Sequence, residues 1–102
     1  MAAELVVAPE AEADIEAAYA WYEERRHGLG EDFLSSVDAC IQQILRMPEL
    51  HGKVHHDYRR ALVRRFPFAV FYEFDADAEE VTIYCVFHTS RDPEKWRERL
   101  SG

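Results

Sequence analysis

The spacing of apolar residues predicts one short strand followed by two helices. Residues 4–8 form a β-branched run that Pro9 ends, which is typical of a strand. In the next two segments apolar residues recur at helical spacing. They are Ala11, Ile15, Ala18 and Tyr22 in the first segment, and Phe33, Leu34, Val37, Ile41, Ile44 and Leu45 in the second. We therefore expect helices over residues 9–27 and 31–47. The tight reversal at Gly28-Leu29-Gly30 should pair them as an antiparallel hairpin.

The second half of the chain reads as sheet. Three strands are predicted over residues 59–65, 68–74 and 81–87. The middle strand is apolar on both faces, which is typical of a strand covered on both sides. On the last strand we place Tyr84, Val86 and His88 on one face. A short helix after Pro93 should fold Trp96 back onto the sheet.

These elements predict a single α+β domain over residues 1–102, in the order β-α-α-β-β-β. A helical hairpin would pack on a small, mostly antiparallel sheet, with a short C-terminal helix. Apolar runs are too short to cross a bilayer, and the first residues lack the pattern of a signal peptide. We therefore expect a cytoplasmic protein without a membrane partner. Cys40 and Cys85 lie in apolar patterns and should be buried thiols.

Charge is unevenly distributed. The net charge is −8, and residues 1–50 alone carry three basic and eleven acidic side chains. Between positions 51 and 65 the balance is locally basic, with Asp57 opposing five cations. These cations are Lys53, Arg59, Arg60, Arg64 and Arg65. Strong nucleic-acid binding needs a broad cationic surface, and this patch is small.

Three segments of the chain stand out as motifs: LRMPELHG (residues 45–52), RALVRRFPFAVFYEF (residues 60–74) and VFHTSRDPEKW (residues 86–96). Their order, together with the order of the predicted elements, resembles the RelE/ParE superfamily of bacterial toxins. In that family an Arg-rich strand, a Phe-Pro turn, a Tyr-bearing strand and a terminal H-x-x-R-x-P-x-x-W segment follow one another. The resemblance implies the toxin of a type II toxin–antitoxin, or plasmid stabilisation, system. Its partner would be a cognate antitoxin, in a hetero-oligomeric complex.

One branch of the superfamily resembles ribosome-dependent messenger-RNA endonucleases. Cleavage of RNA through its 2′-OH requires two proton-transfer groups and cations on the phosphate. The candidates here are His88 as acid or base, with Arg64, Arg65, Arg91 and Lys53 for the phosphate. Adjacent residues of a strand point to opposite faces, so at most one of Arg64 and Arg65 would join His88. No second titrating group is evident.

The other branch resembles inhibitors of DNA gyrase, which bind their target without catalysis. The acidic composition and the long C-terminal segment favour this ParE-like branch, and a non-toxic binding module is a further alternative. We expect the target or antitoxin surface to involve aromatic and basic residues. They are Arg60, Arg64, Arg65, His88, Arg91, Trp96, Trp21 and Tyr22. No cofactor is implied. His51, His55 and His56 invite a zinc hypothesis, but two are adjacent in a predicted loop, so no metal site is expected.

Overall fold

The computed structural model describes residues 3–101, which form a mixed five-stranded sheet flanked by helices. The elements are β1 (Glu4–Val7), α1 (Pro9–Arg25), α2 (Leu29–Arg46), β2 (Lys53–His55), β3 (Tyr58–Leu62), β4 (Phe68–Asp75), β5 (Glu80–His88) and α3 (Pro93–Ser101). The strand order is β1-β5-β4-β3-β2. β1 runs parallel to β5 and every other neighbouring pair is antiparallel, so the predicted α+β arrangement is confirmed.

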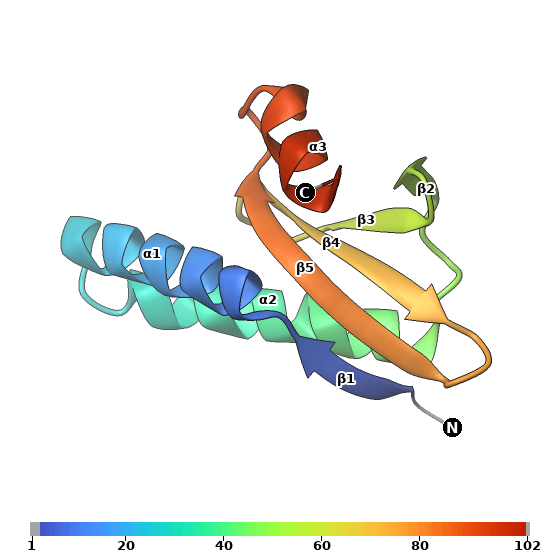
Figure 1. Ribbon diagram of the computed structural model, residues 1–102. Helices are drawn as coiled ribbons and strands as arrows, with labels where there is room; N and C mark the ends of the chain where they lie inside the picture. Colours follow the sequence, from blue (N-terminus) through green and yellow to red (C-terminus); the bar gives the residue numbers. More distant parts are fainter. Residues whose placement is uncertain (1–2, 102) are drawn as a thin grey trace.

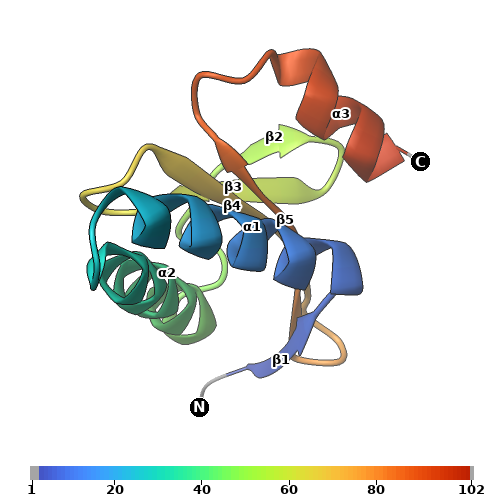
Figure 2. The ribbon, with the colours of Figure 1, turned by 90° about the vertical axis from the view of Figure 1, so that its left-hand side faces the viewer.

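The sheet separates two layers of helix (Figures 1 and 2). α1 and α2 cover one face and α3 covers part of the other. Two groups of buried residues result. The hairpin-side core comprises Ala11, Ala18, Phe33, Val37, Cys40, Ile41, Ile44, Leu45, Ala61, Val63, Phe66, Val70, Tyr72, Val81, Ile83 and Val86. The α3-side core comprises Ala69, Phe71, Cys85, Phe87, Trp96 and Leu100. Because β4 contributes to both cores, the prediction that it is covered on both faces is confirmed.

The prediction that Arg64 and Arg65 belong to a strand is wrong. β3 ends at Leu62, and both arginines lie in the loop that leads to β4. Arg65 has φ = 72°, a left-handed conformation incompatible with an extended strand. The Val63 N–H donates to the Phe68 carbonyl at 2.9 Å and so begins the reversal. The alternation argument for these two side chains therefore does not apply. The strand β2, which includes His55, was not predicted.

A bulge in β5 overturns the prediction that Tyr84, Val86 and His88 share a face. Phe71 pairs with Cys85, and Tyr72 pairs with Ile83, so Tyr84 is an additional residue in β5. A residue inserted in this way shifts the alternation of the strand. Tyr84 packs against the α3-side core, whereas Val86 is part of the hairpin-side core.

The turn between the two helices is held by a side chain from α1. The Gly28 N–H donates to both carboxylate oxygens of Glu23 at 3.0 and 3.1 Å, and the Gly30 N–H donates at 3.0 Å. Gly28 has φ = 91°, which glycine adopts without a steric penalty. No side chain within α2 caps its first turn, so Glu23 satisfies N–H groups that would otherwise lack a partner.

The hydrogen bonds from Gly28 and Gly30 hold the pKa of Glu23 below its usual range, against the opposing effect of burial. A depressed pKa contributes stability that is present above the unfolded value, about 4.3, and is lost as pH falls through the lower folded value. We expect Glu23→Gln to melt at a lower temperature than the wild type at pH 7, with the gap closing below about pH 4. Thermal melts across pH measure this, with Glu24→Gln as the control. A gap that persists in acid would contradict the assignment.

Both cysteines are buried, as predicted, and neither forms a disulfide. Burial raises the pKa of Cys40 to about 11 and that of Cys85 to about 12, so both thiols stay protonated at neutral pH. Cys40 belongs to the hairpin-side core and Cys85 to the α3-side core, so each reports on a different layer. Within residues 3–101, none of the helices has the length and apolar character needed to cross a membrane.

Candidate functional site

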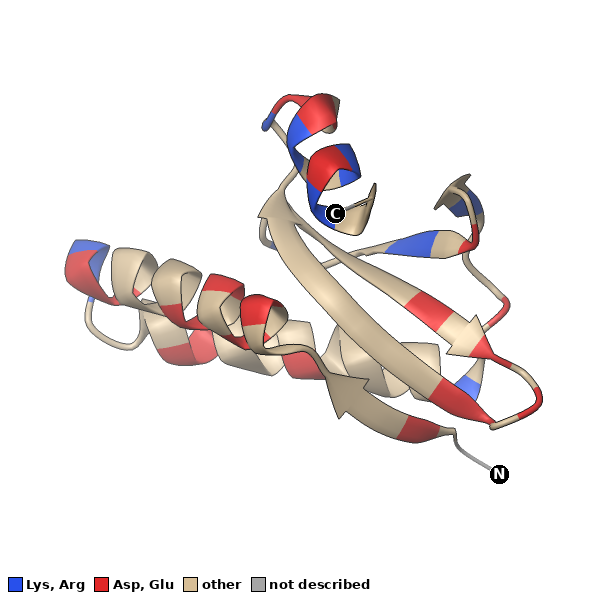
Figure 3. Ribbon diagram, in the orientation of Figure 1, with Lys and Arg blue, Asp and Glu red and all other residues tan. Residues whose placement is uncertain are grey.

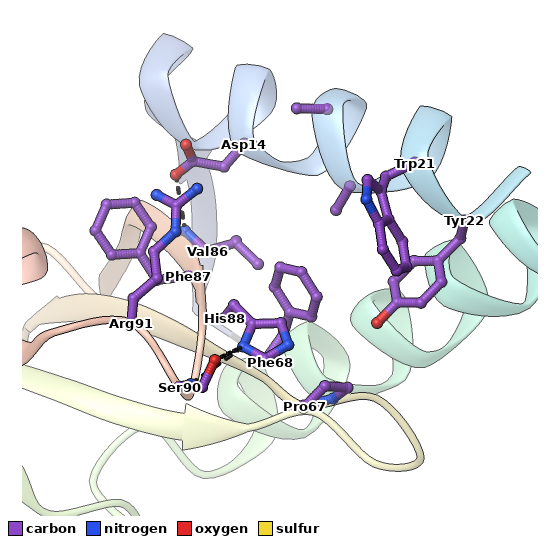
Figure 4. A pocket seen from close by; sticks show the side chains of 12 residues that line it. Asp14, Trp21, Tyr22, Pro67, Phe68, Val86, Phe87, His88, Ser90 and Arg91 are labelled. Atoms are coloured by element: carbon purple, nitrogen blue, oxygen red, sulfur yellow. Dashed lines mark hydrogen bonds between the residues drawn. The ribbon is translucent and has the colours of Figure 1, made fainter. Parts of the chain in front are cut away.

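An open groove of about 640 Å³ lies between α1 and the end of β5 (Figure 4). It is lined by Asp14, Ala17, Ala18, Trp21, Tyr22, Pro67, Phe68, Val86, Phe87, His88, Ser90 and Arg91. Four residues that the sequence singled out, Trp21, Tyr22, His88 and Arg91, come together here. They are brought from the two ends of the chain because α1 packs along β5 beyond the point where β1 ends.

The α1 wall of the groove is aromatic. Trp21 is 50% exposed, and its ring meets Tyr22 edge to face with centroids 5.1 Å apart. The Arg25 guanidinium lies 3.7 Å from the centre of the Trp21 ring and holds the indole against the helix. Tyr22 packs against Phe33 and Phe66, and burial raises its pKa. Tyr22 is thus part of the core, whereas Trp21 is available for contact.

The β5 wall of the groove ends in a compact polar turn. The Nδ1 atom of His88 accepts the Ser90 N–H at 3.1 Å and lies 2.7 Å from the Ser90 hydroxyl. The His88 ring rests edge-on against Phe68, with centroids 5.2 Å apart. Arg91 donates its N–H to the His88 carbonyl, and its exposed guanidinium lies 5.1 Å from the centre of the Phe87 ring. The turn therefore presents one imidazole and one guanidinium to the groove.

Asp14 is a central residue that the sequence analysis missed. Its Oδ2 accepts the Val86 N–H at 3.0 Å and pairs with the Arg99 guanidinium at 2.9 Å. It thus connects α1, β5 and α3. β1 pairs with β5 only as far as Ile83, so the edge of β5 beyond that point needs another acceptor. A signal was present, because Asp14 falls at helical spacing between Ala11 and Ala18 on the buried face of α1.

The cations proposed for an RNA-cleaving site are dispersed. Lys53 lies on β2, paired with Asp57 at 3.1 Å. Arg60, which was expected on the target or antitoxin surface, lies on β3. Three strand spacings, about 14 Å, separate β2 from β5, which carries His88. Arg64 and Arg65 line a different hollow on the far side of α2. Of the nuclease candidates, only His88 and Arg91 share the groove.

Trp96 supports α3. Its ring stacks on Phe71 with centroids 4.8 Å apart, and the side chain is 8% exposed. The prediction that Trp96 folds back onto the sheet is confirmed. Because so little of the side chain is exposed, Trp96 stabilises the end of the chain and offers little surface to a partner.

The three histidines of the zinc hypothesis do not meet at one point: His55 and His56 pack together, and His51 lies beside Tyr72. His55 and His56 have ring centroids 4.2 Å apart, and the Nε2 atom of His55 lies 3.0 Å from the Ser101 hydroxyl. His51 packs beside Tyr72, and burial, with the nearby Arg59 charge, lowers its pKa. Across residues 3–101 there is no group of three or more side chains suited to a metal ion.

Solved structures share this fold at low sequence identity. The RelBE2 toxin–antitoxin complex from Mycobacterium tuberculosis matches with a TM-score of 0.63 and 15% identity, covering 86% of this chain and 99% of that chain. The chromosomal ParDE system from P. aeruginosa matches with a TM-score of 0.62 and 19% identity, covering 86% of this chain and 97% of that chain. The isolated E. coli RelE toxin matches with a TM-score of 0.66 and 14% identity, covering 98% of this chain and 97% of that chain.

Comparison of the sequence with known families identifies the family, whereas the solved structures share only the fold. A search of curated proteins found no significant relative. The family model for the ParE toxin of the type II toxin–antitoxin system parDE matches residues 5–93, which include both helices of the hairpin and, apart from Glu4 at the start of β1, every strand. The chain therefore belongs to the ParE toxin family of type II toxin–antitoxin systems.

Proposed function

We propose that this toxin arrests growth by binding DNA gyrase rather than by cutting RNA, and that a cognate antitoxin neutralises it by occupying the groove between α1 and β5. The observation that carries the proposal is the distribution of side chains. The groove combines an exposed indole with an imidazole and a guanidinium, whereas three of the four cations considered for phosphate chemistry, Lys53, Arg64 and Arg65, lie elsewhere. An aromatic residue beside an arginine is typical of a protein-binding hot spot.

The chemistry of the groove suggests how an antitoxin would bind. Ala17, Ala18 and Trp21 line the groove from α1 and form its apolar wall, and Arg91 lines it from the turn after β5. An amphipathic helix could lay its apolar side against this wall and direct a carboxylate to Arg91. The RelBE2 relative from M. tuberculosis is itself a toxin–antitoxin complex, which supports a protein partner for this chain.

Filling the groove should prevent antitoxin binding. Ala17 is exposed and lines the groove, so Ala17→Arg adds a long charged side chain there with only a small loss of helix propensity. We expect affinity for the cognate antitoxin to fall about 30-fold or more. Calorimetry on the purified pair measures the change. Ala20→Arg is the matched control, because Ala20 is exposed on the same helix but does not line the groove. Equal binding by both variants would place the antitoxin elsewhere.

The mode of toxicity is tested separately through His88. A general acid or base contributes about 100-fold or more to a rate, so a nuclease would lose its toxicity in His88→Ala. We expect His88→Ala to retain growth arrest, transcripts in arrested cells to stay intact, and the purified wild-type chain to inhibit supercoiling by purified gyrase. Transcript ends mapped within codons on the ribosome, abolished by His88→Ala, would instead establish the endonuclease alternative.

A further inference from the structure

A second hollow, of about 740 Å³, lies between α2 and the loop that joins β3 to β4. It is lined by Ser35, Ser36, Ala39, Cys40, Gln43, Arg46, Leu62, Arg64 and Arg65. We call it the arginine pocket. α1 lies over β5 and α2 over β3 and β4, so the arginine pocket and the groove flank the helical hairpin on opposite sides.

The three guanidinium groups of this pocket have no salt-bridge partner among the residues that the structure describes. Within residues 3–101, none of Arg46, Arg64 and Arg65 has a carboxylate within salt-bridge distance, although the chain carries twenty acidic residues. Figure 3 shows acidic residues along α1, on β1 and around the β4–β5 turn. α2 also carries Glu31, Asp32 and Asp38, but none of them is within salt-bridge distance of the three arginines. Three cations around one hollow repel one another, and a bound anionic group would relieve that repulsion.

The stability of the loop does not explain why residue 65 is an arginine. The residue has φ = 72°, a conformation that costs a side chain about 1 kcal/mol relative to glycine. The backbone around it is fixed by two hydrogen bonds, from the Val63 N–H to the Phe68 carbonyl at 2.9 Å and from the Phe68 N–H to the Phe66 carbonyl at 2.8 Å. A guanidinium is thus placed at the hollow by a backbone that would suit glycine better.

The pocket also has an apolar surface, which narrows the class of ligand. Leu62 is 62% exposed, and Ala39 is exposed beside it on α2. Ser35 and Gln43 add neutral hydrogen-bonding groups. Carboxylates pair well with guanidinium groups, and an apolar side chain would cover Leu62. A nucleic-acid backbone would gain from the arginines alone and would meet repulsion from the rest of a chain of net charge −8.

We propose that the arginine pocket binds an acidic amphipathic segment of a partner polypeptide, with carboxylates on Arg46, Arg64 and Arg65 and an apolar side chain on Leu62. This site goes beyond the proposed function, because it stands whether or not the groove on the other side of the hairpin holds the antitoxin. Binding of this kind weakens as salt screens the charges.

The test measures binding to the full chain by fluorescence anisotropy. The probe is a labelled synthetic peptide with glutamates and leucines at helical spacing. The comparison ligands are the same peptide with lysine in place of glutamate, and a single-stranded RNA oligonucleotide. We expect the acidic peptide to bind, with affinity falling as salt rises, and the lysine peptide not to bind. Arg46→Ala and Arg65→Gly should each weaken binding about tenfold. Arg97→Ala is the control, because Arg97 is an exposed arginine on α3 paired with Glu94.

Arg65→Gly separates binding from folding. Glycine adopts the backbone conformation of Arg65 without penalty, so the variant should melt close to the wild type. Three results would overturn the proposal: no binding of the acidic peptide, binding that Arg46→Ala and Arg65→Gly leave unchanged, or tighter binding of RNA than of the peptide. Self-association of the chain that depends on these arginines would also overturn it, because the occupant would then be a second copy.

Discussion

Trp96→Ala is expected to lower the free energy of unfolding by about 3 kcal/mol. The indole stacks on Phe71 and is 8% exposed, and with Leu100 it is the part of α3 that is buried against the sheet. Removing it leaves a cavity over β4 that a nine-residue helix cannot close, because only Leu100 remains buried. Urea denaturation followed by circular dichroism measures the loss.

Thiol reactivity locates this effect within the molecule. Cys85 lies under α3 in the α3-side core, whereas Cys40 lies in the hairpin-side core. If α3 detaches locally in Trp96→Ala, a thiol reagent should label Cys85 faster while labelling of Cys40 stays slow. Arg91→Ala is the control, because Arg91 is exposed and should leave both the melt and the labelling unchanged. Equal acceleration at both cysteines would indicate global unfolding and contradict the local role of Trp96.

Asp14→Ala should cost about 2 kcal/mol. The substitution leaves the Val86 N–H without its acceptor at the edge of β5 and removes the carboxylate that holds Arg99. An unsatisfied buried donor is costly, whereas a partly exposed ion pair contributes less. Asp14→Asn should therefore be milder, because the amide oxygen can still accept from Val86. Chemical denaturation of the two variants measures both losses.

A double-mutant cycle isolates the pairing of Asp14 with Arg99. Arg99→Ala alone should cost about 1 kcal/mol or less, because its side chain is 32% exposed. If Asp14 acts mainly through Val86, Asp14→Ala should remain strongly destabilising when Arg99 is already alanine. If Asp14→Ala becomes neutral in that background, the ion pair carries the whole effect, and the proposed role at the β5 edge is wrong.

The sequence by itself determined which faces of the helices and of the central strand are buried. The helical spacing of apolar residues in α1 and α2 identified their buried faces, and the apolar character on both faces of β4 indicated a covered central strand. The position of Trp96 on a short helix after Pro93 was also correct. These features follow from local periodicity, because a side chain's face within a helix or strand is fixed by its own backbone geometry.

Local pattern failed where the backbone departs from regular geometry. Arg64 and Arg65 lie in a loop after β3, and Arg65 has a left-handed backbone conformation that a strand does not allow. The bulge at Tyr84 shifts the alternation of side chains along β5. Neither departure can be read from periodicity, because each depends on how a strand pairs with its neighbour. The short strand β2 was missed for a related reason, since three residues are too few to show a pattern.

Only the tertiary structure decided which candidate residues meet. The strand order places β5 beside α1, and so brings His88 and Arg91 to Trp21 across most of the length of the chain. The same order sends Lys53 to the far edge and leaves Arg64 and Arg65 on the other side of α2. Strand order and packing depend on contacts between residues distant in sequence, which no local spacing encodes. The sequence therefore supplied the side chains of the groove, and the packing of α1 on the open edge of β5 assembled them.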